Sequence, residues 1–330
     1  MSTVPITLAC GHYDRTAALG DGRIHIEGCA VTFLPLEPEE IFHRAFRFHE
    51  FDVCELSFSS FLRTVAGGTA AYVGIPAFIS RVFRHSGIYV RTAAGIRRPE
   101  DLRGKRVGLP EYQITAVVWM RGMLQHEYGV HPTEIHWRSG GQEQPGRRER
   151  TPLKAIPGVD LQPIADDQTL VGMLRAGELD ALFTARAPSS FLAAEPHIAR
   201  LFADTRAAEI AYFKKNRLFP IMHLVGIRKT LAEQYPWLAT SVYKAFREGK
   251  DLAMTRLTDV NALAVTLPFL EAETRETMAA MGRDFWPYGV RENLGEIEAL
   301  AQYAFEQGLL DRQVKADELF SPSTFEMSRI

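Results

Sequence analysis

Two groups of polar side chains stand beside apolar segments of this chain in arrangements suited to acid–base chemistry and anion binding. His12 and Asp14 follow directly after an apolar run, where a histidine can exchange protons near neutral pH and a carboxylate can orient it. The alternative is that Asp14 caps a helix and His12 is an ordinary loop residue. Arg81, Arg84 and His85 lie within another apolar run. Because an unpaired buried charge is costly, these arginines either bind a ligand carboxylate or pair with an acidic residue of the protein.

Further candidates follow other apolar runs. Glu55 precedes a serine-rich turn and either pairs with an arginine or acts as an acid whose pKa is raised by burial. Ser57 and Ser59 either bind a carboxylate or cap the next helix. His223, beside Met222, is either a satisfied core residue or a ligand contact. The remaining candidates for ligand contact are Arg15, Tyr112, Gln113, Thr115 and Arg186.

Composition narrows the possible partners. The 330 residues include 38 Lys and Arg against 40 Asp and Glu, a formal net charge of −2, so there is no broad electrostatic basis for binding nucleic acid or an anionic membrane. Cys10, Cys29 and Cys54 fit no zinc or redox motif. The first residues lack the basic and long apolar regions of a signal peptide. We therefore expect a protein of the reducing cytoplasm, and a homo-oligomer whose only other partner is a small-molecule substrate.

Apolar strand-like runs alternate with amphipathic segments along most of the chain, which predicts α/β layering. Strands are expected at 6–10, 31–34, 51–56, 79–91, 180–183 and 221–227, with another after a helical turn at 99–108. Helices are expected at 38–48, 61–66, from 111 to about 128, and over most of 236–307.

The two long runs at 79–91 and 221–227 enclose a complete α/β set. They predict paired crossovers between two lobes, with residues 1–86 and 224–330 forming lobe 1 and residues 87–223 an inserted lobe 2. Ligands of open α/β sheets bind beyond the carboxyl ends of the strands. The loops expected at a cleft between the lobes are 11–16, 55–60, 111–116 and 184–188.

This arrangement resembles the type II periplasmic-binding-protein fold, with each lobe a mixed sheet flanked by helices. From Leu8 to about Gly308 the chain also resembles the 4,5-dihydroxyphthalate decarboxylase family. The segments that carry this resemblance are Phe51-Asp52-Val53-Cys54-Glu55-Leu56-Ser57, Ile75 to Ser86, Gly108-Leu109-Pro110-Glu111-Tyr112-Gln113 through Trp119, Phe219-Pro220-Ile221-Met222-His223 and Asp284-Phe285-Trp286-Pro287-Tyr288-Gly289. The chain departs from the family pattern at Cys54 and Phe58.

The resemblance implies a cytoplasmic, non-oxidative decarboxylase of phthalate degradation, a carbon–carbon lyase that converts 4,5-dihydroxyphthalate or a close analogue to protocatechuate. Protonating the ring carbon that bears the departing carboxylate is the accessible route, because a phenolate para to it supplies the electrons. Within this scheme the candidate catalytic residues are His12, Asp14, Glu55 and His85, and the other candidates bind substrate. Since no metal-ligand spacing is present, we expect neither a metal nor another cofactor.

Two alternatives share the fold. One is a ligand-binding protein of a transport system for a small aromatic or other carboxylate, and the other is a cytoplasmic enzyme that makes precursors of menaquinone or thiamine. Fold alone does not choose among them. Trp286 and Tyr288 are expected to pack in the core rather than stack on a ligand, and the run Arg147-Arg148-Glu149-Arg150 is expected to be a solvated loop or a subunit contact.

Overall fold

The computed structural model describes residues 3–149 and 152–327. The chain divides into two compact units, which are described separately. Unit 1 comprises Met1–Arg81, Phe213–Glu298 and Val314–Ile330, and unit 2 comprises Val82–Tyr212 and Ala299–Gln313. The division differs from the predicted lobes by several residues at each crossover. It also assigns residues 299–313, which were expected in lobe 1, to unit 2.

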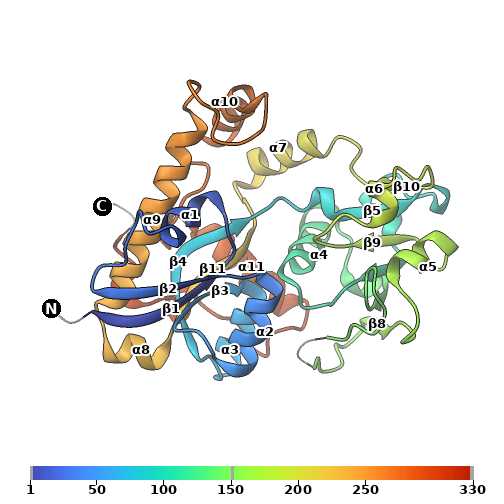
Figure 1. Ribbon diagram of the computed structural model, residues 1–330. Helices are drawn as coiled ribbons and strands as arrows, with labels where there is room; N and C mark the ends of the chain where they lie inside the picture. The colour runs from blue at the N-terminus through green and yellow to red at the C-terminus, as the bar shows by residue number, and fades with distance from the viewer. Residues whose placement is uncertain (1–2, 150–151, 328–330) are drawn as a thin grey trace. The chain divides into compact units, whose positions relative to one another are not determined.

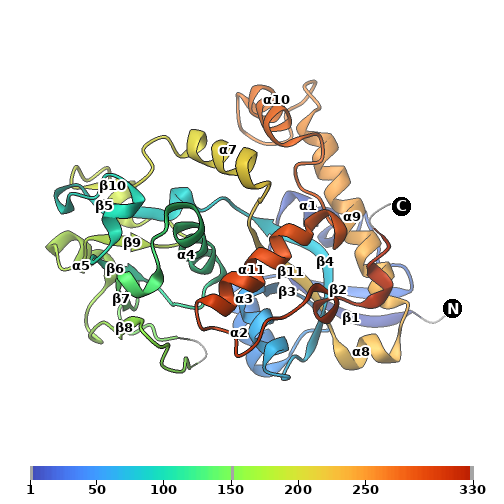
Figure 2. The same ribbon diagram turned by 180° about the vertical axis from the view of Figure 1, so that it is seen from behind.

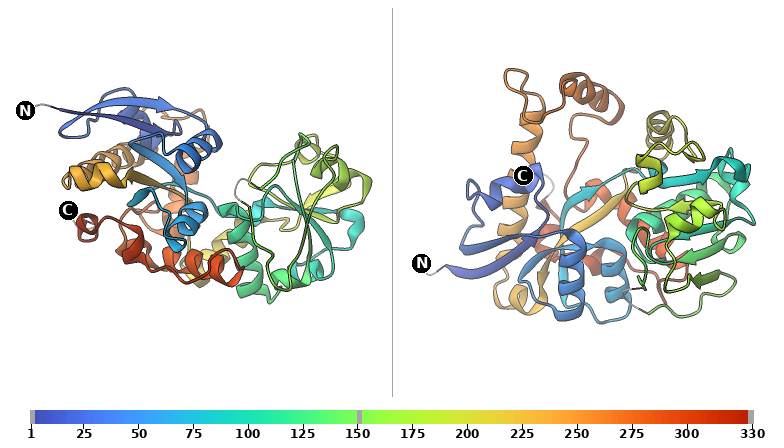
Figure 3. Two further views of the ribbon diagram at one scale, coloured as in Figure 1. Left: turned by 90° about the horizontal axis from the view of Figure 1, so that it is seen from below. Right: turned by 45° about the vertical axis from the view of Figure 1, so that its right-hand side comes forward.

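Unit 1 is built on a five-stranded mixed sheet in the order β2-β1-β3-β11-β4 (Figure 1). Its strands are β1 (Val4–Cys10), β2 (Cys29–Pro35), β3 (Val53–Ser57), β4 (Tyr72–Arg81) and β11 (Ile221–Arg228). Strands β1, β2 and β3 are parallel, and β11 runs antiparallel to both β3 and β4. Figure 3 shows β1 and β2, in blue, running side by side. The inward-facing side chains of this sheet, among them Leu8, Val53 and Phe78, are fully buried.

The helices of unit 1 follow local signals in the sequence. Helix α2 begins at Pro38, whose fixed backbone angle suits a first turn, and Glu39 and Glu40 in that turn complement the helix dipole. Gly249 of α9 lies against the carbonyl of Arg15, where a Cβ would come within 2.7 Å of the oxygen, so glycine allows α9 to approach α1. The helices are α1 (Asp14–Gly20), α2 (Pro38–Phe48), α3 (Phe58–Ala66), α8 (Lys229–Gln234), α9 (Leu238–Leu257), α10 (Leu270–Met281) and α12 (Ala316–Leu319).

Unit 2 is built on a six-stranded mixed sheet in the order β10-β5-β9-β6-β7-β8 (Figure 2). Its strands are β5 (Ile88–Arg91), β6 (Arg106–Leu109), β7 (His136–Ser139), β8 (Asp160–Pro163), β9 (Ala181–Phe183) and β10 (Ile198–Arg200). Its helices are α4 (Thr115–Tyr128), α5 (Leu170–Ala176) and α6 (Ser189–Leu192), while α7 (Thr205–Asn216) and α11 (Leu294–Glu306) cross the division between the units. Residues Thr115 to Leu124 of α4 are all buried, which identifies α4 as the central helix of this unit.

The segment predicted as one strand at 79–91 is not continuous, so that prediction is wrong. Strand β4 ends at Arg81, a 3-10 turn follows at His85–Gly87, and β5 begins at Ile88. Arg84 has φ −118° and ψ 6°, which is outside the extended region. The apolar side chains Val82 and Phe83 hid the break, because hydropathy does not distinguish an apolar turn from a strand.

Residues 299–313 belong to unit 2 because they pack on α4. Tyr303 lies against Gly122, where a Cβ would come within 2.0 Å of the ring, and stacks edge-on against Trp119. Gln307 accepts a hydrogen bond from Arg121 at 2.8 Å and donates one to the carbonyl of Val118 at 2.9 Å. Arg121 also lies in this core, with its charge against the Tyr112 ring.

Two features are absent from the part of the chain that the structure describes. Within 3–149 and 152–327, no helix combines the length and the apolar composition that a membrane crossing requires. Over the same ranges, no group of three or more His, Cys, Asp or Glu side chains is placed to hold a metal ion.

Candidate active site

The central feature of unit 1 is a buried pair formed by Glu55 and His223. Glu55 lies on β3 opposite Val225 of β11, and Ser57 lies opposite His223. Because side chains alternate along a strand, Glu55 and His223 are diagonal neighbours on one face of the sheet. Nδ1 of His223 and Oε1 of Glu55 are 2.6 Å apart. The antiparallel pairing of two strands far apart in sequence therefore assembles the pair.

Glu55 also accepts two hydrogen bonds from the loop after β1. The backbone N–H of Gly11 donates at 2.8 Å, and the hydroxyl of Tyr13 donates at 2.9 Å. Thr16 holds this loop by accepting from the Tyr13 amide at 2.9 Å and donating to the Gly11 carbonyl at 2.8 Å. Glu55 is completely buried, which alone would raise its pKa, but the bonds from His223, Gly11 and Tyr13 outweigh burial and lower it. Glu55 is therefore a carboxylate at neutral pH.

His223 is the member of the pair that reaches the surface of unit 1. Its side chain is 19% exposed, whereas that of Glu55 is 0% exposed. The ring of Phe42 packs edge-on against the imidazole at 4.8 Å. With Nδ1 occupied by Glu55, the ring nitrogen left for a ligand is Nε2. These contacts are those of a histidine oriented by a carboxylate, an arrangement that supports proton transfer.

Arg15 supplies a cation beside this pair. Its guanidinium lies over the rings of Tyr13, at 4.3 Å, and Trp286, at 4.5 Å. Its Nε donates to the Ile79 carbonyl at 2.6 Å, and its Nη1 donates to Asp14 at 3.0 Å. The two rings and the carbonyl fix the orientation of the guanidinium, and its planar N–H groups suit recognition of a carboxylate. Trp286, which the sequence suggested as a core residue, thus helps to hold a charged group.

The predicted pair of His12 and Asp14 is placed differently from the expectation. His12 is exposed in the loop after β1. Asp14 is the first residue of α1, and its carboxylate accepts from the amide and the guanidinium of Arg15. The carboxylate that orients a histidine in unit 1 is Glu55, and the histidine is His223. Both belong to the predicted set, but the sequence did not pair them.

The serine-rich turn after β3 is largely internal. Ser57 and Ser59 are both buried, and the Ser60 hydroxyl donates to that of Ser57 at 3.3 Å. Ser57 is the N-cap residue of α3, although its side chain makes no capping hydrogen bond. Cys54 and Phe58, the two departures from the family pattern, are also fully buried, so both are core substitutions.

Arg81 forms a buried ion pair in unit 1. Its side chain is 0% exposed, and Nη2 donates to Asn293 at 2.5 Å and to Glu296 at 3.2 Å. The second prediction for this arginine, an ion pair with an acidic residue, is the one that the structure shows. Burial lowers the pKa of Arg81 to about 10, which leaves it charged at neutral pH.

Arg84 and His85 lie in unit 2, at the turn before β5. His85 is 1% exposed and is enclosed by the rings of Phe202, at 5.0 Å, and Tyr212, at 5.2 Å. Burial lowers the pKa of His85 to about 4, so the imidazole is neutral at pH 7. A neutral, enclosed imidazole is poorly suited to donate a proton, which counts against the predicted catalytic role. Burial likewise lowers the pKa of Arg84, to about 10.

Unit 2 contains a half-buried carboxylate, Glu149, which lies in the charged run 147–150. Glu149 accepts hydrogen bonds from the Tyr112 amide and, at 3.0 Å, from the Gln113 side chain. Burial raises the pKa of Glu149 to about 7, and the charge of Glu111 adds to the rise. Arg147 pairs instead with Glu111, at 2.6 Å. The run is thus only partly solvated, since Arg148 is exposed while Arg147 and Glu149 are half-buried by contacts within unit 2. The alternative of a subunit contact stays a prediction, and Arg150 lies outside the described residues.

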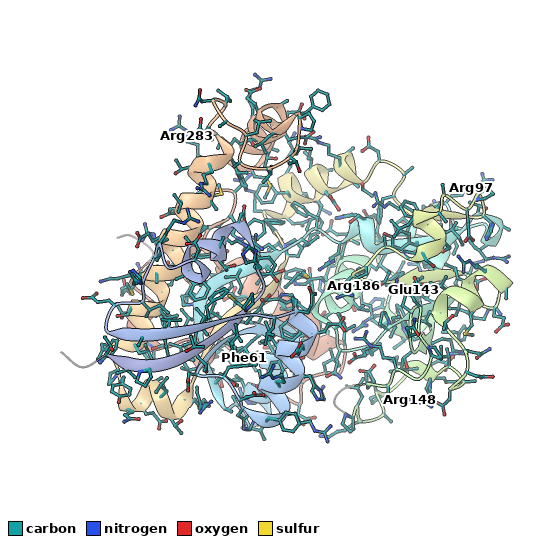
Figure 4. The ribbon with its side chains drawn as sticks, in the orientation of Figure 1. Phe61, Arg97, Glu143, Arg148, Arg186 and Arg283 are labelled. Carbon is teal, nitrogen blue, oxygen red and sulfur yellow. The ribbon has the colours of Figure 1, made fainter. Side chains whose placement is uncertain are left out.

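The other candidates of unit 2 lie after the carboxyl ends of parallel strands. The Thr184 hydroxyl, after β9, donates to the side chain of Gln142, after β7. Gln142 in turn donates to the Arg186 carbonyl at 3.2 Å. Thr115 is buried as the first residue of α4. Figure 4 labels Arg186, exposed after β9, and Glu143, which accepts from the Ser189 amide at 2.8 Å.

Comparison with solved structures identifies the class of fold. The aliphatic sulphonate binding protein SsuA of Escherichia coli matches with a TM-score of 0.53 and 14% identity, over 98% of this chain and 99% of that one. The periplasmic sulfonate-binding protein SsuA of Methylobacillus flagellatus matches with a TM-score of 0.55 and 13% identity, over 99% of this chain and 94% of that one. The chain thus has the α/β architecture of the periplasmic binding proteins, as predicted. At this identity the likeness concerns the fold alone.

Comparison with curated proteins identifies the family. The 4,5-dihydroxyphthalate decarboxylase of Comamonas testosteroni is 44% identical over 330 residues, which is 100% of both chains. The 4,5-dihydroxyphthalate decarboxylase of Pseudomonas putida is 42% identical over 214 residues, covering 65% of this chain and 83% of that protein. No protein-family model matches the chain. The chain belongs to the 4,5-dihydroxyphthalate decarboxylase family, which confirms the resemblance drawn from its segments.

Proposed function

We propose that this protein is a carboxy-lyase that removes one carboxylate of 4,5-dihydroxyphthalate as carbon dioxide and releases protocatechuate. The observation that carries the proposal is the 44% identity to a 4,5-dihydroxyphthalate decarboxylase over the full length of both chains. The acid–base pair in unit 1 supports it, because a non-oxidative decarboxylation needs proton transfer and no change of oxidation state in the enzyme.

The chemistry sets three requirements. Direct loss of carbon dioxide would leave an in-plane aryl carbanion that the ring does not stabilise. Protonation of the carbon that bears the departing carboxylate avoids this carbanion, and the hydroxyl para to that carbon supplies the electrons once it is ionised. The enzyme therefore needs a proton donor, a means of holding the phenolic oxygens and a cation for the carboxylate that stays.

Unit 1 offers groups that fit these requirements. Glu55 and His223 form an oriented carboxylate–histidine pair, and Arg15 provides a guanidinium fixed between two rings. A carboxylate bound to Arg15 would gain charge-assisted hydrogen bonds. The free cysteines Cys10, Cys29 and Cys54 agree with our proposal that the protein works in a reducing compartment.

Incubation of the purified protein with 4,5-dihydroxyphthalate tests the reaction. Released carbon dioxide and protocatechuate are measured together, by trapping and by chromatography, and their amounts are expected to be equal. Phthalate, which lacks the para hydroxyl, is the matched control and is expected to give no product. Tight binding of 4,5-dihydroxyphthalate by calorimetry without any turnover would contradict the proposal and favour a ligand-binding protein.

A further inference from the structure

We propose that His223, oriented by Glu55, transfers the proton to the ring carbon, and that the same histidine exchanges one ring hydrogen of the product with solvent. The inference rests on the proposed decarboxylation and extends it in two ways. It assigns the proton donor, and it adds an activity that needs no loss of carbon dioxide.

The geometry of the pair gives the two residues different roles. Glu55 is 0% exposed and engages Nδ1 of His223 at 2.6 Å. It is therefore a positioning residue, since it fixes the ring of His223. His223 is partly exposed, and its Nε2 is the atom of the pair that can meet a substrate. Imidazole is also suited to giving and recovering a proton near neutral pH.

The other candidate proton donors are less suited to this step. Glu55 itself has a lowered pKa and stays ionised. Burial and the adjacent Glu55 raise the pKa of Tyr13, and its hydroxyl proton is already donated to Glu55. His85 is enclosed in unit 2 with a pKa lowered to about 4.

The step balances without an oxidant or a reductant. The Nε2–H bond of the imidazolium breaks and a C–H bond forms at the carbon that bears the carboxylate, using an electron pair of the ring that the para phenolate replaces. The bond to the carboxylate then breaks, its electron pair restores the aromatic ring, and carbon dioxide leaves. Neutral His223 regains a proton from solvent.

The same proton transfer applied to the product exchanges a hydrogen. In protocatechuate the carbon that carried the lost carboxylate is C6, which lies beside the remaining carboxylate and para to the 3-hydroxyl. In heavy water His223 carries deuterium and delivers it to C6. The carbon then bears the two isotopes on opposite faces of the ring, and loss of the original hydrogen as a proton to solvent on the far face restores the ring with deuterium at C6. Exchange is expected at C6 and not at C2 or C5, because only C6 occupies the reacting position.

Proton NMR of protocatechuate in heavy water with the intact protein tests the inference. The C6 signal is expected to disappear while the C2 and C5 signals persist. His223→Gln is expected to slow both this exchange and decarboxylation by about 10²- to 10⁴-fold. His25→Gln, which changes an exposed histidine remote from the pair in sequence, is the matched control and should retain both rates. Calorimetry of protocatechuate binding separates lost chemistry from lost folding, and the Kd of His223→Gln should change by only a few-fold.

The pH dependence of kcat tests whether Glu55 positions His223 or only supports the fold. Glu55→Gln keeps the shape of the side chain but removes the charge, so the pH–rate profile of kcat should shift to lower pH while KM changes little. Glu55→Asp should restore part of the wild-type profile. An unchanged profile in Glu55→Gln would overturn its positioning role.

The outcomes separate this inference from the proposed function. Decarboxylation without exchange at C6, or exchange that persists at the wild-type rate in His223→Gln, would overturn the inference and leave the proposed function standing. Exchange at C6 that depends on His223, with no turnover of 4,5-dihydroxyphthalate, would support the proton-transfer role and overturn the proposed substrate. Equal exchange at C2, C5 and C6 would overturn the positioned transfer.

Discussion

Glu55 in unit 1, which is completely buried, and Glu149 in unit 2, which is half-buried, both accept a backbone N–H, yet their pKa values shift in opposite directions. The pKa of Glu55 is lowered, and that of Glu149 is raised to about 7. Both receive a backbone amide and a side-chain donor, so the number of neutral hydrogen bonds does not explain the difference. Glu55 has His223 at 2.6 Å, whereas Glu149 has a like charge, Glu111, nearby. The comparison teaches that burial raises the pKa of a carboxylate unless its hydrogen bonds and an imidazole partner together outweigh that cost.

The largest expected effect comes from removing the carboxylate of the ionised pair. Glu55→Ala leaves the Gly11 amide, the Tyr13 hydroxyl and Nδ1 of His223 without their shared acceptor. We expect a loss of about 3 kcal/mol in the free energy of unfolding, measured by urea denaturation at pH 7. Glu149→Ala, the matched change in unit 2, should cost clearly less, because it also removes an unfavourable buried charge. Equal losses would contradict the comparison.

A smaller effect is expected from a change that leaves both charges in place. At Gly11 an added Cβ would come within 2.4 Å of the Tyr13 ring, so Gly11→Ala must move that ring away from Glu55. We expect a loss of about 1–3 kcal/mol, together with a weaker hold on His223. Tyr13→Phe removes only the hydroxyl and serves as the control for the lost bond. If Gly11→Ala is no more destabilising than Tyr13→Phe, the close approach of the ring is not what limits position 11.

The raised pKa of Glu149 predicts a pH dependence of stability with a definite sign. The unfolded carboxyl ionises near pH 4.3, while the folded one keeps its proton to about pH 7. The folded state therefore binds more protons across this window, so stability falls as pH rises through it and the loss is complete above pH 7. Glu149→Gln removes this loss. Its free energy of unfolding relative to the wild type, taken from denaturation curves, should therefore be about 1–3 kcal/mol higher at pH 8 than at pH 4.

Glu55 should show the opposite trend. Its lowered pKa contributes stability that is present above the unfolded value and is lost as pH falls through the folded value. A wild-type protein that loses the Glu55 contribution on raising the pH from 5 to 8 would contradict this assignment. The free energies of unfolding of Glu55→Gln and Glu149→Gln, each measured at pH 5 and pH 8, test the opposite pKa shifts directly.

The smallest effect is expected at the exposed pair of Asp14 and Arg15. Asp14 is 48% exposed, so its ion pair is screened by solvent. Asp14→Asn should change the free energy of unfolding by less than about 0.5 kcal/mol. A loss as large as that of Glu55→Ala would show that the loop after β1, and not the buried pair, dominates stability in this region.

Local signals predicted much of the fold. The helix expected at 38–48 is present as Pro38–Phe48, because Pro38, the acidic first turn and the apolar spacing all agree. The strands near 6–10 and 221–227 and the turn at 99–108 are also present. The break after Arg81 was missed because hydropathy does not distinguish a turn that carries apolar residues from a strand.

The sequence predicted several residues of the site but not which of them contact one another. Glu55 and His223 were both candidates, but they are 168 residues apart in sequence, and the strand pairing that joins them leaves no local signal. Tyr13 and Gly11 were missed, although both flank the candidate His12. Glu149 was missed because a run of charged residues is usually exposed. Its burial depends on bonds to Tyr112 and Gln113, which only the folded chain brings near.

Gly11 has a consequence for how this site can change by mutation. The residue contributes a backbone amide to Glu55, and its lack of a side chain makes room for the Tyr13 ring. Every amino-acid replacement there adds at least one carbon atom, whichever base of the codon is altered. The charged groups of the site can change in small steps, such as Glu to Gln or Asp. At position 11 the smallest possible change already adds a methyl group against the Tyr13 ring. Directed evolution of a new substrate range should find its accepted changes elsewhere in the loop, and an altered Gly11 only together with a smaller residue at position 13.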